Sequence, residues 1–371
     1  MSIKEVGLFH YDLPLVGPVR LRGQELTQRH GYLIRFILDS GEQAWGEVAP
    51  LPGFSREDSG QVLRQLRLLK SSLTGTRLPD NLEKLDGGFG NWLGHIKLVP
   101  SVWMGVEIAV LQLLAKQKEK SLPCLLCDHP RKKLPVNALL SGSEDTVLTR
   151  AADLAQLGYD TFKLKVGARP VEEDARIVER LRETVGPKAK IRLDANRAYD
   201  TQTAVDFAKA VQVFDIDYIE EPVRNYLELL QLTRSGAFRL PVALDESLLT
   251  ISPKALTQLR GLRAIVLKPT LIGLEWSLWF ARRAQRLGMP AVISSSFESS
   301  LGLSVIAAVG GCLNGGADGE RVAMGLDTIS WLTEDLTAES LRIEDGHIDL
   351  EHIPAGVFDV SHPSVREVTD D

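Results

Sequence analysis

Cysteine is scarce in this chain, which contains three among 371 residues. Cys124 and Cys127 form a CxxC pair, CLLC, which alone could indicate a redox pair or half of a zinc site. No second pair and no cluster of histidines accompanies it, and the neighbouring leucines favour a buried helix. We therefore interpret these two thiols and Cys312 as structural, and nothing in the sequence requires an oxidising compartment.

Long apolar runs and a large net charge are also absent. The longest apolar runs are far shorter than the roughly 18 residues that indicate a membrane span. The formal net charge is −6, which gives no overall attraction to nucleic acid or anionic lipid. The first residues, MSIKEVGLFHYDLPL, become charged too early for a secretory signal. We expect a cytoplasmic protein without nucleic-acid or membrane partners, and the sequence leaves the oligomeric state open.

The first hundred residues predict an α+β unit. Residues 2–13, 31–38 and 44–48 have the composition and flanking turns of β-strands. A Pro/Gly loop, PLPGF, follows at 50–54. In QVLRQLRLLKSSL (61–73) the apolar residues then recur at helical spacing, with basic residues on the opposite face.

From about residue 134 the pattern changes to strands alternating with amphipathic helices. Eight such units predict a (β/α)8 barrel rather than an open doubly wound sheet. No GxGxxG follows the first strand candidate, which argues against dinucleotide binding. The strand candidates are VNALL (136–140), TFKLKV (161–166), KIRLDA (190–195), DYIEE (217–221), PVALDE (241–246), AIVLKP (264–269), AVISSS (291–296) and RVAMGL (321–326).

We therefore predict the α/β class, with a barrel and an α+β capping domain. The length exceeds that of a usual single core, so two structural units are expected. Residues 1–98 are the predicted capping domain and 99–340 the barrel. Residues 341–371 are irregular and acidic, and we expect them to pack back on the capping domain and to fray at 368–371.

Charged residues end five consecutive strand candidates, although strands covered on both faces should be apolar. They are Lys165, Asp194, Glu220, Asp245 and Lys268, and their numbers differ by 29, 26, 25 and 23. Each step is about one βα unit, so the side chains should lie at equivalent heights around the C-terminal rim, where barrel active sites form. Any one of them alone is more often a solvated loop residue. The register of all five favours a site.

Three carboxylates from adjacent strands would repel one another unless a cation lies between them. Oxygen ligands favour Mg²⁺, with Mn²⁺ as a possible substitute. Lys163 and Lys165 are two residues apart and share one strand face. A lysine among other cations can act as a base near neutrality. This combination favours removal of a proton alpha to a carboxylate, with the ion stabilising the enediolate.

These motifs resemble those of the enolase superfamily, in particular its muconate-lactonizing subgroup, over nearly the whole chain. The resemblance rests on the KxK of TFKLKVG, the DAN of RLDANRAYD, the EEP of YIEEPV and the DES of ALDES. In EEP the first glutamate matches the ligand, so Glu220 is chosen over Glu221. The resemblance implies metal ligands Asp194, Glu220 and Asp245, the acid/base Lys165 and the opposing lysine Lys268.

Racemases, epimerases and cycloisomerases share these motifs, so the substrate must come from other segments. WGEVAPLPGFSRED (45–58), SSSFESSLGL (294–303) and MGLDT (324–328) resemble the o-succinylbenzoate synthase family. That resemblance implies dehydration of 2-succinyl-6-hydroxy-2,4-cyclohexadiene-1-carboxylate to o-succinylbenzoate, on the route to menaquinone or phylloquinone. Lys165 would take the ring proton and return a proton to the departing hydroxide, and Lys268 would place a positive charge over the ring.

Several further residues are predicted to contact the substrate. Gly53 and Phe54 are candidates for a loop that reaches the site, and VRLRGQELTQRHG (19–31) for a second, mobile loop. Ser294, Ser295 and the backbone at Gly325 would hold the succinyl carboxylate. The predicted substrate contacts are Lys163, Arg192, Asn196, Ser294, Ser295 and Gly325, with Arg192 and Asn196 orienting either Asp194 or the substrate.

Two other functions compete with this one. An N-succinylamino acid racemase or dipeptide epimerase would use the same two lysines on opposite faces of its substrate, and the PLPGF region favours the synthase. A barrel that had lost catalysis and served as a scaffold would lack at least one of the five rim residues. All five are present.

Overall fold

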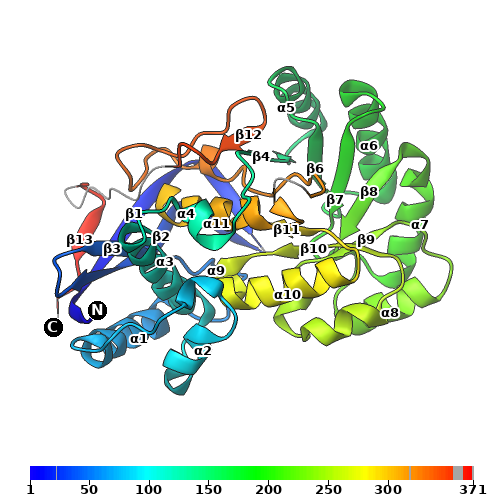
Figure 1. Ribbon diagram of the computed structural model, residues 1–371. Helices are drawn as coiled ribbons and strands as arrows, with labels where there is room; N and C mark the ends of the chain where they lie inside the picture. The colour runs from blue at the N-terminus through cyan, green and yellow to red at the C-terminus, as the bar shows by residue number, and fades with distance from the viewer. Residues whose placement is uncertain (22, 317–318, 354–361, 370–371) are drawn as a thin grey trace.

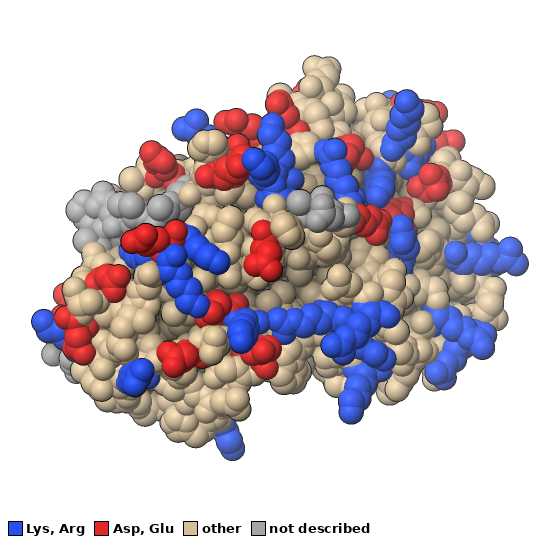
Figure 2. Space-filling view, viewed as in Figure 1, with Lys and Arg blue, Asp and Glu red and all other residues tan. Residues whose placement is uncertain are grey.

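The computed structural model describes residues 1–21, 23–316, 319–353 and 362–369. An antiparallel sheet with helices packed on it lies on one side of the molecule and a parallel barrel on the other (Figure 1). The predicted α/β barrel with an α+β cap is confirmed. On the face shown in Figure 2, acidic and basic side chains are interspersed, with basic side chains gathered over the region of helix α10 (Leu274–Arg286).

The antiparallel sheet has the strand order β13-β1-β2-β3. Its strands are β1 (Ile3–Leu21), β2 (Gln24–Leu38), β3 (Gln43–Val48) and β13 (Val365–Glu367). The last of these pairs with β1, so residues 365–367 lie on the N-terminal sheet, and the last two residues of the predicted frayed end (368–371) lie outside the described residues. The prediction of a loop at 19–31 is wrong, because β1 and β2 form one long hairpin that is paired out to Leu21 and Gln24.

Helices α1 (Ser59–Leu73) and α3 (Pro100–Gln117) pack on this sheet, and the short helix α2 (Gly88–Leu93), between them in the chain, contacts the neighbouring 3-10 turns η1 (Leu82–Lys84) and η2 (Gly94–Ile96). Helix α3 approaches β3 closely at two glycines. A Cβ on Gly46 would lie 1.8 Å from the carbonyl oxygen of Gly105, so neither position has room for a side chain. Helix α3 also contacts the short helix α9 (Pro269–Ile272) of the barrel. The predicted boundary at residue 98 places this shared helix in the barrel, and the boundary stays a prediction.

In the part of the chain that the structure describes, the barrel contains seven parallel strands in sequence order. They are β5 (Ala138–Leu140), β6 (Thr161–Lys165), β7 (Lys190–Asp194), β8 (Ile216–Glu220), β9 (Val242–Leu244), β10 (Leu262–Leu267) and β11 (Ala291–Ile293). The eighth predicted strand (321–326) forms only single bridges, from Met324 to Val136 and from Gly325 to Ser294. These two bridges join the edge strands and close the barrel.

Helices follow the strands of the barrel. Their apolar residues recur at helical spacing, so each helix can bury one face against the sheet. In α6, Ile177, Val178 and Leu181 are buried, and acidic residues that include the buried Asp174 occupy the first turn, where the helix dipole favours them. Side chains of Ser143, Asp200 and Asn225 accept hydrogen bonds at three other helix N-termini. The barrel helices are α5 (Glu144–Gln156), α6 (Val171–Val185), α7 (Thr201–Val211), α8 (Tyr226–Arg234), α9 (Pro269–Ile272), α10 (Leu274–Arg286) and α11 (Ser300–Cys312).

Short elements complete the structure. Strands β4 (Lys133–Pro135) and β12 (His347–Asp349) form a separate antiparallel pair. The 3-10 turns are η1 (Leu82–Lys84), η2 (Gly94–Ile96), η3 (Gln212–Phe214), η4 (Glu246–Leu249), η5 (Pro253–Gln258) and η7 (Ile329–Trp331). Within the described ranges, no helix combines the length and apolarity needed to cross a bilayer. The cytoplasmic location stays a prediction.

The two thiols that lie close together are not the two of the CxxC motif. Cys124 is exposed on the short helix α4 (Leu122–Leu126), which corrects the expected buried position. Cys127 instead lies beside Cys312 at the end of α11. A hydrogen bond from this neighbour lowers the pKa of Cys127, and the same bond together with burial raises the pKa of Cys312. All three thiols are free.

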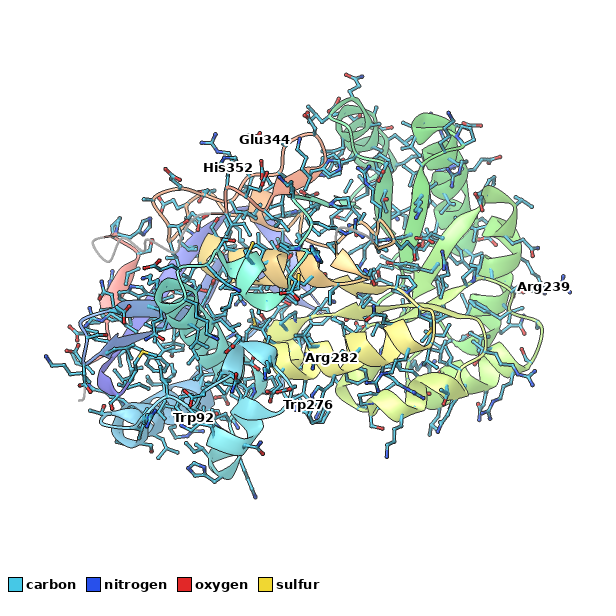
Figure 3. The ribbon with its side chains drawn as sticks, viewed as in Figure 1. Trp92, Arg239, Trp276, Arg282, Glu344 and His352 are labelled. Carbon is cyan, nitrogen blue, oxygen red and sulfur yellow. The ribbon has the colours of Figure 1, made fainter. Side chains whose placement is uncertain are left out.

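Two buried carboxylates join the capping helices to the barrel. Glu107 of α3 accepts hydrogen bonds from the backbone N–H groups of Leu274 and Glu275 (2.7 and 2.9 Å), at the start of α10. The Glu275 side chain in turn accepts from Gly87 N–H (2.8 Å) at the start of α2. Arg282 lies further along α10 (Figure 3). Its side chain donates to the Leu85 carbonyl (2.8 Å). Burial raises the pKa of Glu107 to about 8 despite its two backbone donors.

The raised pKa of Glu107 predicts a pH-dependent stability. A glutamate in the unfolded chain titrates near pH ~4.3. Protonation therefore favours the folded protein, and this contribution is lost as the pH rises from about 4 to about 8. Glu107→Gln should flatten the fall in unfolding free energy between pH 5 and pH 9, measured by urea denaturation. The exposed Glu119→Gln is the control and should keep the wild-type slope. Equal slopes in all three proteins would contradict the assignment.

Candidate active site

A cavity of about 580 Å³ lies between the mouth of the barrel and the N-terminal unit. The N-terminal unit contributes Pro18, Val19, Glu25, Leu51 and Phe54. The barrel contributes Asn137, Leu139, Ser141, Gly142, Lys163, Lys165, Asp194, Asn196, Lys268, Ser294, Ser295, Ser296, Phe297, Gly325, Asp327, Thr328 and Trp331. Both units are therefore needed to form the cavity.

The five charged rim residues lie at the strand ends that their spacing predicts. Lys165 is directly opposite Asp194 in the β6–β7 pair, and Asp194 is opposite Glu220 in the β7–β8 pair. Asp245 and Lys268 come directly after β9 and β10. Parallel register thus brings the five side chains to the same end of the barrel.

Lysine side chains lie among the three carboxylates. Lys163 Nζ lies 2.5 Å from Glu220 Oε2 and 3.0 Å from Asp194 Oδ2. Lys268 Nζ pairs with Asp245. Lys165 differs, because its side chain is 36% exposed whereas that of Asp194 is 2% exposed. The side chains of Lys163 and Lys268 are only 9% and 12% exposed, so Lys165 is the most accessible of the three lysines that line the cavity.

Burial raises the pKa of the three rim carboxyl groups, whereas the neighbouring lysines lower it. Burial raises the pKa of Glu220 to about 7, although the Lys163 ammonium group opposes the shift. Burial likewise raises the pKa of Asp245 against the influence of Lys268. For Asp194 the surrounding lysines outweigh burial and hold the pKa well below its usual range. The buried trio therefore needs nearby positive charge to stay ionised.

The pKa values of Lys163 and Lys268, the two inner lysines, depend on the same two opposing effects. Burial alone would lower the pKa of Lys163, but Asp194 and Glu220 raise it well above the ordinary value. For Lys268, too, the carboxylates outweigh burial and raise the pKa. Three buried carboxylates on adjacent strand ends form an all-oxygen donor set, which fits a hard divalent cation.

A second set of residues, which sequence reasoning did not identify, supports this carboxylate group. Glu221 accepts hydrogen bonds from Asp245 N–H (3.0 Å) and from Ser247 N–H (2.7 Å), and it pairs with Arg197 (3.2 Å). Glu220 and Glu221 therefore have different roles. Glu220 belongs to the rim carboxylates, whereas Glu221 fixes the turn that carries Asp245. Asn196, Arg197 and Glu221 all have positive φ, between 40° and 67°, a conformation that few residues other than glycine adopt.

Most of the predicted substrate contacts line the cavity. Asn196 accepts from Lys165 Nζ (2.6 Å), and its own N–H donates to Asp194 (3.1 Å). The hydroxyls of Ser294 and Ser295 both lie 3.1 Å from the Gly325 carbonyl. The Gly325 N–H donates a hydrogen bond to the Ile293 carbonyl. A Cβ at Gly325 would lie 2.7 Å from Ser294 Oγ, so this glycine provides space rather than a free donor.

Arg192 lies elsewhere than predicted. We expected it to orient Asp194 or the substrate, but it does not line the cavity. Its buried guanidinium group contacts Asp217 (3.1 Å) and donates to the Ala323 carbonyl (2.7 Å). It also lies 4.9 Å from the centre of the Tyr218 ring. Arg192 therefore ties β7 to the segment that closes the barrel.

The capping loop reaches the cavity through Phe54. The Lys268 ammonium group lies 5.4 Å from the centre of this ring. Gly53 is absent from the cavity lining, and its φ of 81° makes the turn that precedes Phe54. Trp331 and Asp327, which line the barrel side, were not predicted. MGLDT contains Asp327, so that motif was the available signal.

The position of Arg192 gives a stability prediction. Arg192→Leu removes a buried donor from Asp217 and from the Ala323 carbonyl, and should lower the unfolding free energy by about 3 kcal/mol. Arg263→Leu is a matched control, because Arg263 meets the same carboxylate at 3.8 Å from an exposed position. The control should cost less than about 1 kcal/mol. If chemical denaturation gave the same loss of unfolding free energy for both variants, the buried contacts of Arg192 would not stabilise the fold more than the exposed contact of Arg263.

Two protein-family models match the chain. The family described as enolase C-terminal domain-like matches residues 146–356, and the MenC N-terminal domain matches residues 3–113. An o-succinylbenzoate synthase of Vibrio cholerae is 32% identical over 315 residues, covering 82% of this chain and 85% of that protein. The chloroplastic protein PHYLLO of Arabidopsis thaliana is 33% identical over 90% of this chain, which spans only 21% of PHYLLO.

Solved structures share the fold at lower identity. A muconate lactonizing enzyme from Pseudomonas fluorescens, complexed with muconolactone, superposes with a TM-score of 0.83 at 22% identity, covering 96% of each chain. A dipeptide epimerase from Cytophaga hutchinsonii, complexed with Mg and a dipeptide, has a TM-score of 0.81 at 22% identity and covers 94% of each chain. At these identities the likeness concerns the fold alone.

Proposed function

Because the chain belongs to the o-succinylbenzoate synthase family of the enolase superfamily, we propose that it is a divalent-metal-dependent hydro-lyase. The proposed reaction is the syn-dehydration of 2-succinyl-6-hydroxy-2,4-cyclohexadiene-1-carboxylate to o-succinylbenzoate, a step towards menaquinone or phylloquinone. The observation that carries this proposal is the position of Lys165. Its side chain lines the cavity, with Nζ 3.6 Å from Asp194, one of the three buried carboxylates.

The proposed metal ligands are Asp194, Glu220 and Asp245, which fit Mg²⁺, with Mn²⁺ as a substitute. A bound divalent ion would supply positive charge to the substrate carboxylate as the enediolate forms. The inner lysines would then share the carboxylates with the ion. Lys163 lies between Asp194 and Glu220, so we expect it to give way when the ion binds.

The proton transfers are assigned to Lys165. In its neutral form Nζ takes the ring proton alpha to the carboxylate, and the electron pair of the broken C–H bond enters the enediolate. The same Nζ then gives the proton to the hydroxyl group that leaves from the same face. Water is released, and the ring becomes aromatic. Asn196, which accepts a hydrogen bond from Lys165 Nζ, would orient this group through both steps.

Other cavity residues would bind the ring and exclude water. Lys268, fixed by Asp245 and beside Phe54, would place a positive charge near the ring. Leu51 and Phe54 of the cap would cover the substrate, and a water-poor cavity strengthens these electrostatic contacts. Ser294 and Ser295, in the space left by Gly325, would hold the succinyl carboxylate.

A second candidate function is the racemisation of an N-succinylamino acid or the epimerisation of a dipeptide. The observation that favours it is that Lys165 and Lys268 line the same cavity from β6 and the end of β10, with three strands between them. Two lysines so placed suit proton transfer on both faces of one carbon. The match of the N-terminal unit to the MenC domain favours dehydration instead.

The test is a spectrophotometric assay of aromatisation with and without Mg²⁺. We expect turnover only with the ion, and Lys165→Ala should lower it by at least about 1,000-fold, because the general acid/base is lost. The exposed Lys188→Ala is the control and should retain wild-type activity. Racemisation of N-succinylamino acids without aromatisation would replace the proposed substrate. Undiminished activity in Lys165→Ala would contradict the assigned base.

A further inference from the structure

A second group of metal-type ligands lies outside the barrel, on the N-terminal sheet. His10 and Asp12 are two residues apart on β1, and His30 of β2 is directly opposite Asp12. All three side chains therefore project from the same face of the sheet. Their ligand atoms lie within 4.8 Å of one another, a spacing that the described residues show in this group alone and not among Asp194, Glu220 and Asp245.

The surroundings explain why this group is accessible. Val6 and Leu8 project from the same face of β1 and are buried in the core. Beyond Leu8 the face opens to solvent, since the side chains of His10 and Asp12 are 36% and 40% exposed. His30 is 54% exposed. An ion from solution can therefore reach the three ligands, and water can complete its coordination.

The distances already suit a common ion. His10 Nε2 lies 3.5 Å from Asp12 Oδ1, and His30 Nδ1 is hydrogen-bonded to the same oxygen. Metal–ligand bonds of about 2.0–2.2 Å in a tetrahedral site place neighbouring ligand atoms roughly 3.3 Å apart. Small side-chain rotations would satisfy this geometry, and the paired strands hold the three Cα positions in place.

The ligand types select the metal. Two imidazoles and one carboxylate suit Zn²⁺, Co²⁺, Ni²⁺ or Cu²⁺, whereas Mg²⁺ prefers oxygen ligands alone. We propose that His10, Asp12 and His30 bind one transition-metal ion of the Zn²⁺ type, at a site separate from the carboxylates of the barrel. This proposal does not depend on which reaction the barrel catalyses.

Occupancy of this site would connect the outer hairpin to the cavity. The ion would bridge β1 and β2 within the stem of the hairpin whose far end contributes Val19 and Glu25 to the cavity wall. A register shift between Pro14 and Val19 separates the stem from that end. The bridge would therefore restrain the stem from which the cavity-lining part of the hairpin extends.

One neighbouring charge should oppose binding. Arg366 of β13 is directly opposite His10, on the side of β1 away from β2. Residues directly opposite in an antiparallel pair share one face, so its guanidinium group repels an incoming cation. Arg366→Gln should therefore tighten binding, whereas loss of a ligand weakens it. The two opposite effects distinguish this site from nonspecific binding.

The test is calorimetric titration of the full chain with Zn²⁺ in excess Mg²⁺, which keeps the oxygen-ligand site occupied. We expect one tight equivalent in the wild type, and about a tenfold or greater loss of affinity in both His10→Asn and His30→Asn. His95→Asn is the control, since His95 is exposed and lies outside the group. It should leave the affinity unchanged.

Hydrogen exchange provides a second readout. Zn²⁺ should slow exchange in residues 24–30 of the wild type but not of the His10→Asn/His30→Asn double variant. Circular dichroism checks that the variants remain folded. Absence of a tight equivalent in the wild type, or equal Zn²⁺ affinity in the double variant, would overturn the proposal. Unchanged affinity in Arg366→Gln would contradict the predicted location of the ion.

Discussion

The burial of three carboxylates at one barrel mouth is the constraint on which the rest of this site depends. Asp194, Glu220 and Asp245 are each at most 4% exposed, and charges in such surroundings are costly unless opposite charges accompany them. Lys163 and Lys268 provide that compensation from within the barrel. Lys165, whose Nζ lies 3.6 Å from Asp194, is the most exposed of the three lysines, and it is therefore available to a substrate.

The second requirement is a cap that closes the mouth. The barrel alone holds the charged groups, but Leu51 and Phe54 come from the N-terminal unit. Arg29 anchors their loop, since it donates to the carbonyls of Pro50 (2.6 Å) and Phe297 (3.1 Å), one on each side of the interface. Hydrogen bonds between the units therefore fix the shape of the cavity, and chemistry and substrate fit come from different parts of the chain.

Sequence spacing predicted the rim because one residue at each strand end is a regular, local feature. Sequence spacing was a poorer guide to side chains whose position depends on their depth in the barrel or on contacts with residues far away in the sequence. Arg192 shares a strand face with Asp194, yet it lies one layer deeper, and alternation gives the face but not the depth. The polar tip of the first hairpin resembles a loop because its strands are recognised only by pairing with each other. Glu221 acts on Ser247, 26 residues away, and Cys127 meets Cys312, which no local pattern reveals.

The most direct test of the central claim is a crystal structure of the Mn²⁺-soaked protein with anomalous data. We expect a peak bound by Asp194, Glu220 and Asp245, with Lys163 Nζ moved away from its present position between the first two. Such a peak would establish that the buried carboxylates form a metal site. Carboxylates that remain paired only with Lys163 and Lys268, with no peak among them, would contradict it.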